Sequence, residues 1–160
     1  MKTLIVYYSL EGNTEWVAQK IAENTKADVL RLVPKKEYPK EGFKKFFWGG
    51  KSVVFGEKPV LEEYQLSLGD YDKIVIGSPI WASSYTPPIK TFLADNKIEG
   101  KNIYLFICHS GGGAQKCFQK LGEELKNNKI ISTIDFNNPK IKPDVNLEKQ
   151  LKEFCNKINS

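Results

Sequence analysis

The apolar residues of this chain follow two patterns. Largely continuous apolar runs are typical of strands covered on both faces of a sheet, and they occur at residues 2–8, 28–33, 73–77, 101–108 and 130–136. Apolar residues spaced three or four positions apart are typical of helices with one buried face. That spacing occurs at about residues 13–24, 86–95, 114–125 and 147–158. Thr86-Pro87 predicts the start of the second of these helices, as an N-cap followed by Pro at the first helical position. We therefore expect strands and helices to alternate along the chain.

Residues 35–63 are the least regular part of the sequence. A helical projection places lysines on one side of this segment. The opposite side carries Phe43, Phe46, Phe47, Gly50 and Val54. We expect a helix with one buried face and solvated lysines, broken or loosened at Gly49-Gly50. A polar connection beginning at Pro59 should then lead to the next strand.

The alternation of strands and helices predicts an α/β fold, with a mostly parallel sheet covered by helices on both faces. Linkers, repeats and low-complexity tracts are absent, so we expect one domain over residues 1–160. Ligands of such sheets bind at the carboxyl ends of the strands. Three unusual loops follow predicted strands there, at residues 9–14, 78–85 and 109–113. We expect these loops to form one site.

The loop at residues 9–14 is suited to holding an anion. It joins a strand to a helix, and the first N–H groups of a helix are unpartnered and partly positive. The P-loop and dinucleotide fingerprints are absent, and the turn has no Lys, Cys or Arg. A neutral cup that holds a phosphate without hydrolysing it fits these residues. The alternative is an ordinary turn capped by Asn13.

The other two loops offer places for a flat ligand. Trp81 can stack on a ring, and Pro79 stiffens its loop; alternatively, Trp81 and Tyr85 are packing residues at the rim of the sheet. Gly111 to Gly113 allow the backbone to approach a ligand closely, or form a flexible turn. His109 beside them has no assigned role, and we predict neither a catalytic residue nor a metal site.

Composition and charge disfavour a secreted, disulfide-stabilised protein and a membrane-spanning protein. The net charge of +5 is local, because residues 31–58 hold eight basic and three acidic residues and the remaining 16 basic and 16 acidic residues cancel. The three dispersed cysteines suit free thiols in a reducing cytoplasm, and we expect all three in the core. No apolar run approaches the length of a membrane span, and the strand-like N-terminus does not resemble an export signal.

These motifs together resemble the flavodoxin family. The stretch Ser9-Leu10-Glu11-Gly12-Asn13-Thr14 is similar to the family's phosphate loop, apart from Ser at the first position and Glu11 where Thr is usual. The Ser-Pro-x-Trp stretch at 78–81 and the Gly-rich stretch at 109–113 look like the two flavin loops of a flavodoxin-like subgroup. The aromatic and basic stretch at 46–51 also resembles that subgroup.

The resemblance implies a three-layer doubly wound fold with strand order 2-1-3-4-5, and noncovalently bound FMN as the cofactor. The loop at 9–14 would hold the phosphate, with the Glu11 carboxylate pointing away, and the other two loops would flank the ring. The implied cofactor-binding residues are Ser9, Leu10, Glu11, Gly12, Asn13, Thr14, Ser78, Pro79, Ile80, Trp81, Ser110, Gly111 and Gly112.

The implied function is that of an electron carrier, which transfers one or two electrons between redox enzymes and is a non-catalytic electron-transfer protein rather than an enzyme. We expect it to be a cytoplasmic monomer. The alternative on the same fold is an FMN-dependent NAD(P)H oxidoreductase that reduces quinones or flavins. A third hypothesis is a flavin-free module that binds nucleic acid or an anionic membrane through residues 40–51. We favour redox partner proteins, without specific nucleic-acid binding or membrane insertion.

Overall fold

Five parallel strands form the central sheet of the computed structural model, which describes residues 1–40, 42–143 and 145–160, without the side chains of residues 42, 43, 46 and 47. The strands are β1 (Thr3–Tyr7), β2 (Asp28–Arg31), β3 (Lys73–Pro79), β4 (Asn102–His109) and β5 (Lys129–Asn137). Their order is β2-β1-β3-β4-β5, and every neighbouring pair is parallel. The predicted topology is confirmed.

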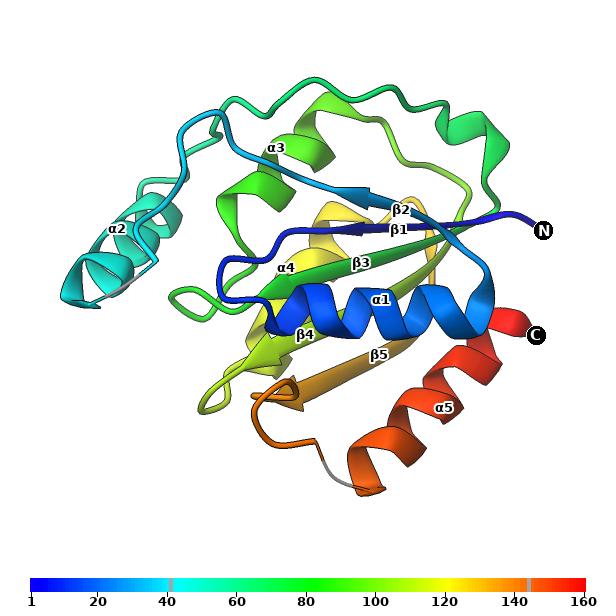
Figure 1. The fold of residues 1–160 in the computed structure, drawn as a ribbon. Helices are drawn as coiled ribbons and strands as arrows, with labels where there is room; N and C mark the ends of the chain where they lie inside the picture. Colours follow the sequence, from blue (N-terminus) through cyan, green and yellow to red (C-terminus); the bar gives the residue numbers. More distant parts are fainter. Residues whose placement is uncertain (41, 144) are drawn as a thin grey trace.

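Helices cover both faces of this sheet (Figure 1). They are α1 (Asn13–Thr25), α2 (Gly42–Val54), α3 (Pro87–Asp95), α4 (Ala114–Glu124) and α5 (Val145–Asn159). The first and last, α1 and α5, lie on one face, and α3 and α4 lie on the other. No helix among the described residues combines the length and the apolar character needed to cross a membrane.

The continuous apolar runs of the central strands contribute side chains to two hydrophobic cores, one on each face of the sheet. Successive side chains of a strand point to opposite faces, so Leu4 and Val6 join the core under α3 and α4, while Ile5 joins the core under α1 and α5. The same alternation separates two adjacent residues of β4, because Leu105 and Phe106 lie in different cores. The three cysteines are free and buried, as predicted.

Two strand ends differ from the sequence prediction by two residues, whereas the other strand boundaries differ by one residue at most. β2 ends at Arg31 instead of continuing to Val33. β3 continues through Ser78-Pro79, because these residues stay in register with Ile107 and Cys108 of β4. The beginning of the second predicted loop is therefore fixed to the sheet.

Helix α2 departs most from the prediction, because it runs without a break through Gly49-Gly50. A Cβ atom on Gly49 would lie 3.2 Å from the indole of Trp81, so the missing side chain permits close packing instead of ending the helix. Val54, predicted on a buried face, is 75% exposed. The predicted burial of Phe43, Phe46 and Phe47 lies outside the described side chains. Figure 1 shows α2 beside the edge of the sheet to which the strand arrows point.

Candidate functional site

The three predicted loops meet at the carboxyl edge of the sheet and border a cleft of about 620 Å³. The predicted site residues that line it are Leu10, Glu11, Asn13, Pro79, Ile80, Trp81 and Ser110. The other predicted residues are not part of this lining: Ser9, Gly12, Thr14, Ser78, Gly111 and Gly112. Structural details show what several of these remaining residues do.

The loop at 9–14 ends at a helix start that no side chain caps. Gly12 is the N-cap of α1, with a left-handed φ of +99° that suits glycine, and its carbonyl accepts the Trp16 N–H. The Ser9 hydroxyl accepts the Gly12 N–H at 3.1 Å, which tightens the loop. Asn13 does not cap the helix; its Oδ1 accepts the Lys140 N–H at 3.1 Å. The alternative of a turn capped by Asn13 is therefore wrong.

Glu11, which stands where the phosphate-loop pattern usually has Thr, forms an ion pair with a residue of α2. The Glu11 carboxylate forms an ion pair with the ammonium of Lys45, which also lines the cleft. The pair brings opposite charges together at the mouth of the cleft, so the Glu11 charge is compensated locally. A bound anion would therefore meet backbone N–H groups at this loop, and the negative charge of Glu11 is largely compensated by Lys45.

Ser78 anchors the second loop from inside the protein. Its side chain is fully buried, and its hydroxyl accepts the Thr86 N–H at 3.0 Å and lies 3.1 Å from the Thr86 hydroxyl. Thr86 and Pro87 occupy the N-cap and first positions of α3, as the sequence predicts. Ser78 thus ties the end of β3 to the start of α3 and holds the intervening loop in place.

Trp81 both lines the cleft and packs against neighbours. Its ring meets Tyr38 and Tyr8 edge to face, at centroid distances of 4.9 and 5.7 Å, and Gly49 lies against it. The following Ala82 and Ser83 have left-handed φ values of 47° and 58°, and the backbones of Trp81 and Ser84 exchange two hydrogen bonds of 3.0 Å. Such conformations cost about 1–3 kcal/mol each for residues other than glycine. The loop is therefore a strained, tight turn.

His109 braces the third loop. Its Nδ1 accepts the Gly112 N–H at 2.9 Å, so Nε2 carries the proton in the neutral ring and donates to Asp135 at 2.8 Å. Gly112 and Gly113 adopt φ values of +109° and +89°, which explains the need for glycine there. Because both ring nitrogens are occupied within the loop, the structure gives His109 a positioning role.

Cys108 lies in the cleft lining as a protonated thiol. Burial raises the pKa of this thiol to about 12, although a hydrogen bond with Thr14 opposes the shift. A thiolate is the nucleophilic form of cysteine, so Cys108 is not a nucleophile near neutral pH. Among the described residues, no group of three His, Cys, Asp or Glu side chains is arranged to hold a metal ion.

The flavodoxin family model matches residues 2–158. The chain belongs to the flavodoxin family. Similar solved structures include a flavoprotein in complex with FMN from Lactobacillus acidophilus NCFM, which is 25% identical with a TM-score of 0.74. That alignment covers 84% of this chain and 92% of the other.

Two further structures share the fold of this flavodoxin-family chain. A protein from Bacteroides uniformis ATCC 8492, provisionally named a flavoprotein, is 21% identical with a TM-score of 0.81, and the alignment covers 97% of both chains. Oxidised flavodoxin 2 from Bacillus cereus is 17% identical with a TM-score of 0.61, covering 98% of this chain and 97% of the other.

Sequence reasoning missed two elements of this flavodoxin-family cleft. Lys45, Gly49 and Gly50 line it from α2, and Asn138 and Ile141 line it from the turn after β5. Asn-Pro at 138–139 signals a turn, but nothing local indicates that the turn reaches the loop at 9–14. On propensity alone the glycine pair favours a helix break, because the contact of Gly49 with Trp81 is visible only in three dimensions.

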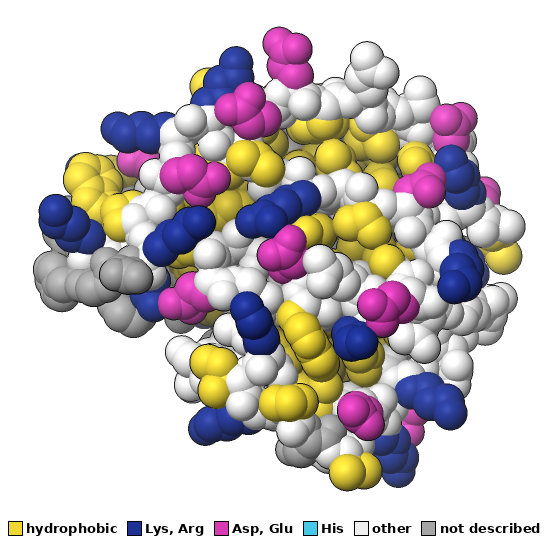
Figure 2. Space-filling model, viewed as in Figure 1, with side chains coloured by type: hydrophobic (Ala, Val, Ile, Leu, Met, Phe, Trp, Pro, Cys, Tyr) yellow, Lys and Arg dark blue, Asp and Glu magenta, His cyan; other side chains and the backbone are white. Residues whose placement is uncertain are grey.

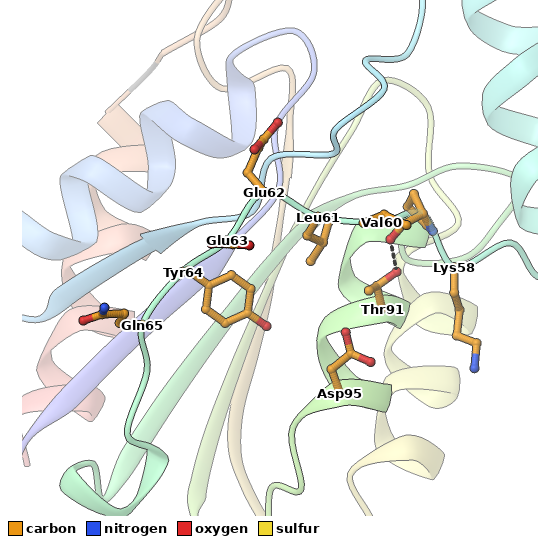
Figure 3. A pocket seen from close by; sticks show the side chains of 10 residues that line it. Lys58, Val60, Leu61, Glu62, Glu63, Tyr64, Gln65, Thr91 and Asp95 are labelled. Atoms are coloured by element: carbon orange, nitrogen blue, oxygen red, sulfur yellow. Dashed lines mark hydrogen bonds between the residues drawn. The ribbon is translucent and has the colours of Figure 1, made fainter.

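A second hollow, of about 820 Å³, lies along the connection between α2 and β3 and over α3 (Figure 3). Its lining includes the carboxyl groups of Glu62, Glu63 and Asp95 and the ammonium of Lys58. The Thr91 hydroxyl donates to the Pro59 carbonyl at 2.8 Å, which ties the connection to α3. Its excess of carboxylates disfavours a phosphate, so the cleft at the sheet edge is the better candidate for an anionic cofactor.

Proposed function

We propose that this chain binds FMN noncovalently and carries one or two electrons between redox proteins. Family membership supports FMN as the cofactor, as does the FMN complex of the 25% identical relative. The observation that carries the proposal is the uncapped start of α1 beside a cleft that Trp81 lines. Its volume of about 620 Å³ falls within the roughly 300–1,000 Å³ of small-molecule sites.

In this proposal, each loop has a distinct task. The backbone N–H groups at residues 13–15, in the first turn of α1, hold the phosphate, as helix starts do in other anion sites. Pro79 to Ala82 and the loop at 109–113 flank the ring from two sides, with Ser78 and His109 keeping those loops in place. The bound flavin supplies the redox chemistry, and the protein supplies orientation and the local electrostatics.

The two reactive side chains that line the cleft, Cys108 and His109, provide no acid, base or nucleophile for chemistry on a substrate, which is compatible with a carrier. The Cys108 thiol stays protonated at neutral pH, and both His109 ring nitrogens are already engaged. Neither group is free to move a proton to or from a substrate in this arrangement. A carrier needs no such group, because its partners only exchange electrons with the cofactor.

The partner of this proposed carrier should present an acidic face. Residues 31–58 hold the net charge of +5, and Trp48, Val54 and Phe55 are exposed on or just after α2. Hydrophobic and Lys/Arg side chains gather at the left edge of Figure 2, where Figure 1 places α2. Complementary charge speeds encounter and is weakened by salt. We also propose that the chain works as a cytoplasmic monomer of one domain, consistent with its three free thiols.

Substitution of Gly12 tests the position of the phosphate. Gly12→Val should abolish FMN binding, because valine is strained at a φ of +99° and its Cβ would lie 3.1 Å from the Lys140 ammonium. Gly100→Val is the matched control, since Gly100 also has a positive φ of +67° but nothing within 4 Å. Equal FMN affinity in the Gly12 variant and the wild type, measured by fluorescence titration, would place the phosphate elsewhere.

Rapid mixing separates the carrier from the reductase. The FMN-loaded protein mixed with NADH or NADPH should keep its flavin absorbance when no partner is present. Fast, stoichiometric bleaching by either nucleotide would overturn the carrier role and favour an NAD(P)H oxidoreductase, while leaving FMN as the cofactor.

A further inference from the structure

The turn after β5 is fastened to two of the cleft loops. The Asn138 N–H donates to the His109 carbonyl at 2.9 Å, and the Lys140 N–H donates to Asn13 Oδ1 at 3.1 Å. The turn is closed by the N–H groups of Ile141 and Lys142, which both donate to the Asn138 carbonyl. The backbone of Lys140 is therefore held against the start of α1.

The Lys140 ammonium lies directly over the loop at 9–14. Its Nζ is 3.1 Å from the position that a Cβ atom on Gly12 would take. Gly12 is also the N-cap of α1, so the ammonium and the partly positive helix start share one small region. Two positive groups side by side repel each other, and a bound anion would turn that repulsion into attraction.

The neighbouring acid does not compensate this charge. Glu11 is paired with Lys45 of α2. In the part of the chain that the structure describes, the ion pairs within 4.0 Å do not include Lys140. The uncompensated charge at the loop is thus that of Lys140 together with the helix start, which suits a dianionic group.

We propose that Lys140 is a ligand of the cofactor phosphate and makes the site select phosphorylated flavin over riboflavin. This inference rests on the proposed function. It changes the expected neutral cup into a cationic one, completed by a residue more than a hundred positions away in the sequence. A charge-assisted contact of this kind should favour FMN by about tenfold, while contributing nothing to a flavin that lacks the phosphate.

The test compares Lys140→Gln with Lys142→Gln in the same turn. Fluorescence titration of the apoprotein gives the Kd of FMN and of riboflavin for each variant. Lys140→Gln should raise the Kd of FMN about tenfold, reduce its dependence on salt, and leave the Kd of riboflavin unchanged. Lys142→Gln should leave the preference for FMN intact, and Lys140→Arg should retain most of it.

A second readout needs no flavin. Inorganic phosphate titrated into the ¹⁵N-labelled apoprotein should shift the Gly12 amide resonance in the wild type, and much less in Lys140→Gln. Equal effects of Lys140→Gln on both flavins, or on neither, would overturn this inference while leaving the proposed function intact. A wild-type protein that binds neither flavin would overturn both.

Discussion

The loops at the carboxyl edge of the sheet and the segment at residues 31–58 border the same cleft but are built differently. The loops are tied down by internal hydrogen bonds, such as those from Gly12 to Ser9 and from Gly112 to His109. The segment instead exposes Trp48, Val54 and Phe55 among lysines. The contrast supports the proposal made above, in which the sheet edge would fix the cofactor and α2 would face a partner.

The largest expected effect concerns the buried cores on the two faces of the sheet, where all three thiols lie. Burial raises the pKa of Cys108 and of Cys117 to about 12 and that of Cys155 to about 11, from 9.0. A group whose pKa is raised by folding contributes stability below its unfolded pKa, and loses it as the pH rises toward the folded value. The contribution of the thiols to the free energy of unfolding should therefore be constant below about pH 9.0 and be lost steeply between 9.0 and about 12.

Urea unfolding at about pH 7, 9 and 10.5 measures this loss. A free energy of unfolding that stays flat to about pH 10.5 would show that the thiols ionise without unfolding the buried cores. Ellman's reagent at neutral pH supplies an independent check, since buried thiols should react only at the rate of unfolding.

Gly77 tests how tightly the sheet holds the second loop. A Cβ atom there would lie 2.0 Å from Cζ of Phe106, in a buried strand with little room to move. Gly77→Ala should lower the free energy of unfolding by about 3 kcal/mol. Gly122→Ala is the control, because its Cβ would make an ordinary contact of 3.6 Å with Ile130. Similar urea midpoints for the two variants would mean that Phe106 moves aside easily.

Trp81, which lines the cleft, and Trp48, which is exposed on α2, separate cofactor binding from partner binding. Trp81→Ala should weaken FMN binding by roughly 1–3 kcal/mol, through lost stacking and burial. Trp48→Ala should leave the Kd of FMN unchanged and slow electron transfer to an acidic partner, because Trp48 is 43% exposed on α2. An unchanged flavin spectrum and affinity in Trp81→Ala would assign that residue to packing alone.

The smallest expected effects come from the glycine pair of α2. Gly50→Ala should stabilise the helix by about 0.5–1 kcal/mol, because nothing lies within 4 Å of the new Cβ. Gly49→Ala should lose that gain, since its Cβ would press on the Trp81 indole at 3.2 Å. Thermal unfolding and tryptophan fluorescence measure both changes. A gain of the same size in both variants would show that α2 does not rest on Trp81.

The sequence predicted most of what depends on local patterns. Apolar runs predicted the five strands, and loop residues at the strand ends predicted the cleft, because parallel strands necessarily bring those ends to one edge. Thr86-Pro87 predicted the start of α3, since both residues suit a helix start whatever surrounds them.

What escaped prediction depends on contacts between distant segments. The interpretation of Gly49-Gly50 as a break did not take into account that Gly49 packs against the distant Trp81. The turn at 138–142 reaches Asn13 across the edge of the sheet, and no local feature of Lys140 indicates that. Ala82 and Ser83 form a left-handed turn without the Asn or Gly that usually signals one.

The most direct test of FMN binding is the visible spectrum of the purified protein, before and after reconstitution with FMN. We predict bands at about 375 and 450 nm, with one FMN per chain and quenched flavin fluorescence. A colourless protein that takes up no FMN on reconstitution would contradict the assignment of this cleft.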